Sequence, residues 1–276
     1  MQTPPPYKSE GKVLGTPKML RARAVLQLSR PAALALARGL PSSGLRLRST
    51  AAEPKVTRDI GYSVVDELER LEALPWYRSL PLRLSGVFSD SNRQAAAASD
   101  MYMHCVAQAS DDQFFAPAAG GLEDRYYRRF QTKGLHCWLC YARLLQEPKE
   151  LSHTIRTDMM EKLWEQVTLD LSEGIDEKEG MDFVTLSKHL KDLQHGWHGF
   201  ARTMDEALAS DDPRAELADA LLRNFYADEE GDLGGPEAEA AAARLAEYVQ
   251  AQLAHLKAIP TEEMLRARIS WAPVAL

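Results

Sequence analysis

Three neighbouring residues have side chains that bind metals or exchange electrons. Cys137 and Cys140 stand three positions apart in Cys-Trp-Leu-Cys, and His136 directly precedes them. Thiol–disulfide motifs share this C-x-x-C spacing, but they usually sit at a helix N-terminus that follows a β-strand. Here the pair lies inside a predicted helix, among bulky apolar residues, with no predicted strand before it. The pattern favours packing in a helical core, with a redox or metal site as the alternative.

A second pair, His195 and His198, places two imidazoles one helical turn apart. No glutamate stands between them as in H-E-x-x-H, and no third ligand is evident. The chain also contains no G-x-S-x-G, P-loop or Rossmann glycine pattern. We therefore predict no catalytic residue, no bound metal and no cofactor.

Charge is distributed unevenly along the chain. Residues 1–52 contain nine of the 33 basic residues but one of the 40 acidic residues, so residues 53–276 carry a net charge of −15. Such an acidic body repels polyanions, and we expect no sequence-specific nucleic-acid binding. Residues 19–52 are rich in Arg, Ala, Leu and Ser and contain no acid, a composition typical of organelle transit peptides. We predict a disordered mitochondrial transit segment at residues 1–52, with a plain basic tail as the alternative.

The remaining composition is consistent with an organelle matrix. No apolar run approaches the roughly 20 residues that a membrane-spanning helix needs. Cysteine occurs three times, at Cys105, Cys137 and Cys140, which is too few for a disulfide framework and fits a reducing compartment.

Apolar periodicity predicts helices over most of the chain. Residues 53–92 predict a short helix followed by irregular chain, because Pro75 and Pro81 should prevent helix continuation. From Asn92 onward the pattern is helical, without a convincing strand. Two long helices have apolar stripes with helical spacing. These are Ile155, Met159, Leu163, Val167 and Leu171 in the first, and Phe183, Leu186, Leu190, Leu193, Trp197, Phe200 and Met204 in the second.

Polar segments and prolines mark the helix boundaries. Ser172–Asp182 predicts a surface loop, and Asp212 with Pro213 predicts a helix start. Residues 228–235 predict a linker, Pro236 opens the next helix, and Thr261 begins a short last one. We predict an all-α fold, a single multi-helix domain of about seven to eight helices at residues 93–273, preceded by an N-terminal extension at 53–92.

The segment around the cysteines resembles a known family. Phe130-Gln-Thr-Lys-Gly-Leu-His136-Cys-Trp138-Leu, followed by Arg143, is similar to the F…LH-x-W…R signature of the ubiquinol–cytochrome c chaperone family. Gly199 through Asp212 and the tail ending at Trp271 also resemble family segments. Met204 replaces a common tyrosine and His198 an aromatic residue. The residues that match family motifs, and thereby become candidates for partner binding, are Leu135, His136, Trp138, Arg143, Trp164, Gly199, Asp205, Glu206, Asp212, Arg223 and Trp271.

The resemblance implies a non-enzymatic assembly chaperone for respiratory complex III. Such proteins bind newly synthesised cytochrome b near the mitoribosome, together with a small helical partner. They act on the matrix side of the mitochondrial inner membrane, where peripheral membrane contact is expected. Trp76, Tyr77, Phe114 and Phe115 are apolar side chains that either dock partners or pack in the core. The alternatives are a permanent helical subunit of a respiratory complex or mitoribosome, and a C-x-x-C redox or metal-binding protein.

Overall fold

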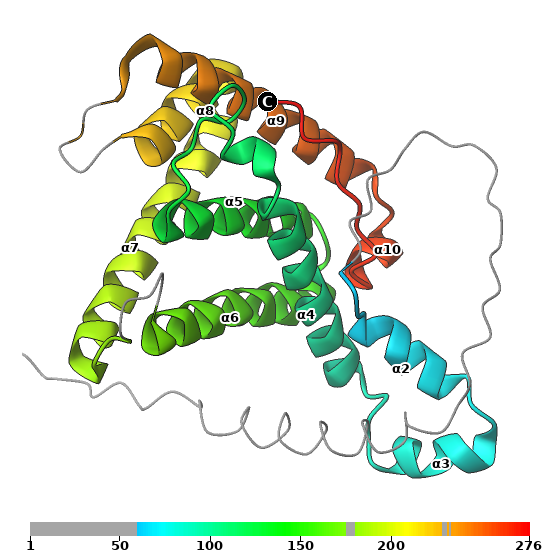
Figure 1. Ribbon diagram of the computed structural model, residues 1–276. Helices are drawn as coiled ribbons and strands as arrows, with labels where there is room; N and C mark the ends of the chain where they lie inside the picture. Colours follow the sequence, from blue (N-terminus) through cyan, green and yellow to red (C-terminus); the bar gives the residue numbers. More distant parts are fainter. Residues whose placement is uncertain (1–59, 175–179, 228–230, 232) are drawn as a thin grey trace, which may run out of the picture. The chain divides into compact units, whose positions relative to one another are not determined.

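The computed structural model describes residues 60–174, 180–227, 231 and 233–276. These residues form helices and no β-strand, which confirms the all-α prediction; the predicted transit segment at 1–52 lies outside them (Figure 1). A 3₁₀ turn, η2 (Asp112–Phe114), and a π-helical turn, η3 (Leu222–Tyr226), complete the described elements. The α-helices are α2 (Val64–Glu72), α3 (Trp76–Leu84), α4 (Asp90–Ala109), α5 (Tyr126–Leu144), α6 (Lys149–Glu173), α7 (Phe183–Leu208), α8 (Pro213–Leu221), α9 (Gly235–Ala258) and α10 (Thr261–Leu265).

Helix α3 is the element that the sequence did not predict. Irregular chain was expected after residue 75, but a helix spans Trp76–Leu84. Pro75 occupies its N-cap, where a missing N–H costs nothing. Pro81 removes one hydrogen bond inside the helix, yet Ser85 still donates its N–H to the Pro81 carbonyl at 3.0 Å. Proline therefore weakens this helix without ending it.

The helix start predicted at Asp212 and Pro213 is confirmed by its cap, and Asp182 caps α7 in the same way. Asp212 accepts a hydrogen bond from the N–H of Ala215, and Pro213 is the first residue of α8. Asp182 accepts from the N–H groups of Val184 and Thr185 at the start of α7. The Thr185 hydroxyl and these N–H groups lower the pKa of the Asp182 carboxyl. These contacts satisfy N–H groups that have no partner within the helix.

Helix α2 is fastened to α4 by a carboxylate. Asp100, which is buried, accepts hydrogen bonds from the N–H groups of Val64 and Val65, both at 2.9 Å, and from the hydroxyl of Ser63 at 2.8 Å. A side chain of α4 thus caps the N-terminus of α2. The predicted boundary between the N-terminal extension and the helical domain, at residues 92 and 93, falls inside α4, which begins at Asp90.

The core is built around α5. This helix contacts α4, α6, α7 and α9, and all seven residues from Gly134 to Cys140 are buried. The predicted stripe of α6 is also buried, from Ile155 to Leu171. The fold is thus centred on the helix that carries the C-x-x-C segment.

The apolar stripe of α7 is buried at Leu186 in its first turn and again in its second half, but not along its whole length. Phe200 and Met204 lie in the core, whereas Leu193 and Trp197 are partly buried. Phe183 is 81% exposed, contrary to the expectation that the whole stripe is covered. Among the described residues, no helix combines the length and the apolar character needed to cross a membrane.

Candidate functional site

The C-x-x-C segment lies in the hydrophobic core, as its sequence context predicts. Cys137 and Cys140 have no exposed surface, and neither has Cys105, whose Sγ lies 3.6 Å from Sγ of Cys140. Burial raises the pKa of the Cys105 thiol well above its usual range, with contacts to the other two cysteines adding to the effect. Reactive cysteines are accessible and have a lowered pKa. The inaccessibility of Cys137 and Cys140 therefore argues against the redox interpretation.

His136 is the centre of a buried hydrogen-bond network. Its Nδ1 lies 2.8 Å from the carbonyl oxygen of Thr132, which can only accept, so Nδ1 carries the proton. Its Nε2 lies 2.8 Å from the hydroxyl oxygen of Tyr248, and Gln108 donates its Nε2–H to the same oxygen at 3.1 Å. The indole of Trp271 packs edge-on against the imidazole. These contacts join α4, α5, α9 and the C-terminal segment in one core.

Two further signature residues tie α5 to distant segments. Trp138 donates its indole N–H to Asp205 of α7 at 3.0 Å. Arg143, with its side chain 7% exposed, donates to the carbonyls of Leu256 and Ile259 at 3.0 and 3.1 Å and pairs with Glu147. Its guanidinium therefore satisfies carbonyl groups where α9 ends.

The remaining motif residues are scattered over the helices. Trp164 is partly buried and its ring contacts Phe130 and Trp197. Gly199 and Glu206 are exposed on α7, and Arg223 is exposed and paired with Asp219. Five of the eleven candidates are buried: Leu135, His136, Trp138, Arg143 and Trp271. These five side chains pack in the described core, and a role of the candidates in partner binding stays a prediction.

His195 and His198 are both exposed on α7. Among the described residues, no group of three or more His, Cys, Asp or Glu side chains is arranged to hold a metal ion. His198 instead places its ring edge-on against Trp197, with centroids 5.2 Å apart.

Gly134 allows α7 to approach α5 closely. A Cβ at this position would lie 3.1 Å from Cδ1 and 3.3 Å from Nε1 of Trp197. The glycine therefore permits a close crossing of the two helices. Trp197 consequently packs against the backbone of α5 on one side and borders an open cleft on the other.

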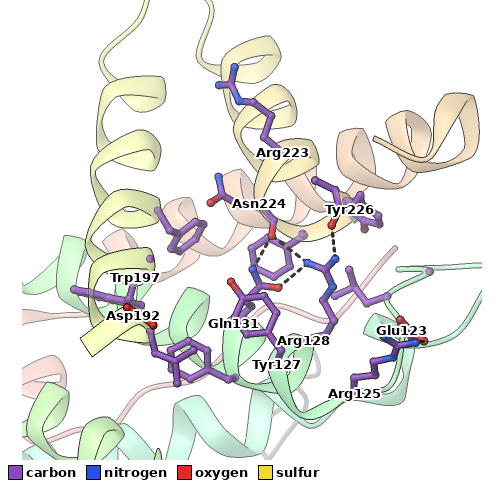
Figure 2. A pocket seen from close by; sticks show the side chains of 18 of the residues that line it. Glu123, Arg125, Tyr127, Arg128, Gln131, Asp192, Trp197, Arg223, Asn224 and Tyr226 are labelled. Carbon is purple, nitrogen blue, oxygen red and sulfur yellow. Dashed lines mark hydrogen bonds and ion pairs between the residues drawn. The ribbon is translucent and has the colours of Figure 1, made fainter. Parts of the chain in front are cut away.

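This cleft has a volume of about 1150 Å³ and lies between α5, α7 and η3 (Figure 2). Its floor is apolar and includes Phe130, Phe200 and Phe225, all buried, with partly buried Trp197 beside them. The indole Nε1 of Trp197 is buried without a hydrogen-bond partner in the described chain. Charged and polar side chains form the rim: Glu123, Arg125, Tyr127, His189, Asp192 and Arg223.

Arg128 and Gln131 hold the wall of the cleft formed by η3. Arg128 donates to the carbonyls of Asn224 and Ala227 at 3.2 and 2.7 Å, and Gln131 donates to the Asn224 carbonyl at 2.6 Å (Figure 2). A π-helical turn leaves backbone carbonyls outside the ordinary α-helical pattern, and such turns are frequent at functional sites. Two side chains of α5 thus fix the position of an irregular turn 93 to 99 residues away.

Comparison with known proteins identifies the family. The model of the ubiquinol-cytochrome C chaperone family matches residues 118–271, more than half of the chain. The chain belongs to this family. No curated protein matches significantly.

The fold also matches a solved structure, the crystal structure of the Cbp3 homolog from Brucella abortus. The TM-score is 0.57 at 23% sequence identity, over 70% of this chain and 97% of the other. This likeness supports the all-α fold. Membership of the ubiquinol–cytochrome c chaperone family assigns the chain a chaperone role in the assembly of complex III.

All residues that line the cleft lie within the range of the family match, whereas α2 and α3 precede it. Of the eleven candidates for partner binding, Arg223 alone lines the cleft, and Phe130 of the signature segment lines it as well. Sequence reasoning did not select Tyr127, Arg128 or Gln131. Tyr127 and Arg128 stand just before the signature, but nothing in their pattern distinguishes a cleft from an ordinary helix surface.

Proposed function

We propose that this protein is a non-enzymatic chaperone that binds newly synthesised cytochrome b through the cleft between α5, α7 and η3. The observation that carries the proposal is the open cleft, in which half-exposed Tyr127 and partly buried Trp197 lie beside the buried rings of Phe130, Phe200 and Phe225. Newly made membrane-protein segments are apolar, and a groove of this kind accepts an apolar helix face.

The size and rim of the cleft support an extended client. At about 1150 Å³ it exceeds the range of roughly 300–1,000 Å³ that is usual for small-molecule pockets. Arg125 is paired with Glu123 and Arg223 with Asp219, so these rim charges are largely balanced. A rim of balanced charge around an apolar floor suits a hydrophobic segment better than a strongly charged ligand.

The cellular setting is part of the same proposal. The transit-peptide composition of residues 1–52 supports import into mitochondria, where the protein acts on the matrix side of the inner membrane. A small helical assembly factor is its partner, and the mitoribosome exit region is where it receives cytochrome b.

Site-specific photocrosslinking tests the client site. A photoreactive phenylalanine analogue at position 127, on the rim, should crosslink to radiolabelled cytochrome b during mitochondrial translation. The same analogue at position 62 is the control, because Tyr62 is similarly exposed and does not line the cleft. Equal crosslinking from both positions, or none from position 127, would contradict the proposal.

A matched pair of variants tests the consequence. Tyr127→Glu places a charge over the apolar floor and should increase unassembled cytochrome b and reduce complex III, whereas Tyr62→Glu should not. Native gels then separate the alternatives. A chaperone migrates apart from mature complex III, whereas a permanent subunit of a respiratory complex or mitoribosome migrates with it.

A further inference from the structure

Helix α3 exposes an unusually large apolar face. The side chains of Trp76, Tyr77, Leu80 and Leu84 are 75%, 58%, 43% and 80% exposed. At 3.6 residues per turn, they fall within an arc of about 100° on one side of the helix. Isolated exposed apolar residues are common on proteins, but four on one face of a nine-residue helix indicate a binding surface.

The rest of the protein holds α3 only lightly. The helix has no extended interface with any other described helix, and Ser79 is its only residue classed as buried. Pro81 has already removed one of its internal hydrogen bonds. Packing within the protein therefore explains few of the apolar residues of α3. Their exposed face is available to bind an external surface.

The charge around α3 is opposite to that of the remaining chain. Residues 73–89 contain Arg78 and Arg83 and no acid, although residues 53–276 carry a net charge of −15. Arg78 lies over the ring of Tyr77, and Arg83 lies over that of Phe88. Glu72 borders Arg83 at 3.7 Å, but its carboxylate is held by Arg93 at 2.5 Å. Helix α3 and its flanks thus carry two cations and no anion between residues 73 and 89.

We propose that α3 docks on an anionic phospholipid bilayer, lying in the plane of the interface. Trp76, Tyr77, Leu80 and Leu84 enter the boundary between headgroups and acyl chains, and Arg78 and Arg83 extend to lipid phosphates. Tryptophan and tyrosine favour this depth because each has an apolar ring with a polar tip. An amphipathic helix with cationic residues and no acid is the pattern of interfacial binding.

The length and position of α3 favour a membrane over a second protein as its occupant. Nine residues span about 14 Å, enough to lie on a bilayer and too short to cross one. The helix precedes the family match at residues 118–271, so it lies outside the part that defines the chaperone. The inference does not depend on cytochrome b being the client.

Vesicle flotation of the full chain provides the first test. Wild-type protein should bind vesicles containing phosphatidylglycerol more tightly than vesicles of phosphatidylcholine alone. Trp76→Ser/Leu84→Ser should weaken binding to the anionic vesicles at least about tenfold, because most of the inserted apolar surface is lost. The basic segment 1–52 is common to all variants, and a high-salt arm screens its contribution.

The matched control removes exposed apolar area elsewhere. Phe183→Ser/Val184→Ser affects two side chains of α7 that are 81% and 75% exposed, and should leave vesicle affinity unchanged. Circular dichroism verifies that both double variants remain folded. Equal loss in the two variants would overturn the proposal, because it would show non-specific apolar adhesion.

Quenching by brominated acyl chains tests insertion directly. Trp76 should account for the quenching of tryptophan fluorescence on anionic vesicles, and Trp76→Phe should retain the affinity while losing this quenching. Unchanged quenching in Trp76→Phe, or unchanged affinity in the double α3 variant, would overturn membrane docking. Loss of a co-purifying protein without loss of vesicle binding would assign the face to a protein partner. Crosslinking of cytochrome b at position 127 is independent of all three outcomes.

Discussion

The indole of Trp197 lies against the backbone of Gly134, so close that a Cβ at position 134 would stand 3.1 Å from its Cδ1. This contact sets the distance between α5 and α7. It also places the tryptophan at the edge of the cleft, next to the buried floor residue Phe200. The packing of the signature helix and the shape of the proposed client site therefore depend on the same pair.

Replacing Gly134 by valine should destabilise the fold by about 1–3 kcal/mol, the usual effect of overpacking. The added methyl groups must displace Trp197 or separate the two helices. Urea denaturation measures the change in the free energy of unfolding. In a Trp197→Ala background the same substitution should be less harmful, because the indole that it meets is absent. Strictly additive effects would show that the two residues do not limit each other.

Tyr248→Phe should destabilise the protein by about 1–3 kcal/mol. The change removes the hydroxyl that contacts both Nε2 of His136 and Nε2 of Gln108, in a site closed to water. Tyr127→Phe is the control, because Tyr127 is 50% exposed and its hydroxyl reaches solvent. Chemical denaturation of both variants tests the network, and equal free energies of unfolding would argue against it.

The sequence predicts those parts of the fold that follow from local pattern. The α6 stripe from Ile155 to Leu171 and the cap at Asp212 are visible because helical periodicity and capping involve residues a few positions apart. The α3 prediction failed because Pro81 was treated as a helix breaker, although this helix loses one hydrogen bond and continues.

The cleft could not be predicted from the same information. Its η3 wall is set by Arg128, which reaches a carbonyl 96 residues away at Asn224. Such a contact leaves no periodic trace in the chain. The family signature was visible, but sequence cannot distinguish a motif that packs the core from one that binds a partner. His136 and Arg143 are motif residues that pack in the core.

Asp100→Ala should loosen α2 selectively. The substitution removes the acceptor for the N–H groups of Val64 and Val65 and for the hydroxyl of Ser63. We expect a loss of about 1–3 kcal/mol, since two buried or partly buried N–H groups at the helix start lose their acceptor. Hydrogen exchange should show faster exchange in residues 64–72 than in α5. Ser63→Ala removes an exposed cap on the N–H of Asp66 and the bond to Asp100 but keeps both N–H contacts to Asp100, so it should have a smaller effect. Unaltered exchange in Asp100→Ala would refute the proposed role of its carboxylate.

His104 should make stability depend on pH just below neutrality. Burial lowers its pKa, and the charge of Asp100 opposes this shift only in part. In the unfolded chain the imidazole titrates near its ordinary pKa of about 6.5. Below that pH the unfolded state binds a proton that the folded state does not. The free energy of unfolding must therefore fall as the pH decreases from about 6.5 towards the folded pKa of His104, by at most about 1.4 kcal/mol per pH unit.

This pH dependence is tested by the slope of the free energy of unfolding against pH, rather than by the stability at one pH. Urea denaturation at a series of pH values should give a shallower slope for His104→Gln than for the wild type. Phe183→Ser, which changes an exposed side chain without a titratable group, should keep the wild-type slope. Glu72, Asp124 and Asp182 have lowered pKa values. Their contributions to folding stability are therefore lost only below pH about 4.5, outside the pH range in which His104 acts. Identical slopes for His104→Gln and the wild type would mean that the imidazole of His104 is as accessible to protons in the folded chain as in the unfolded one.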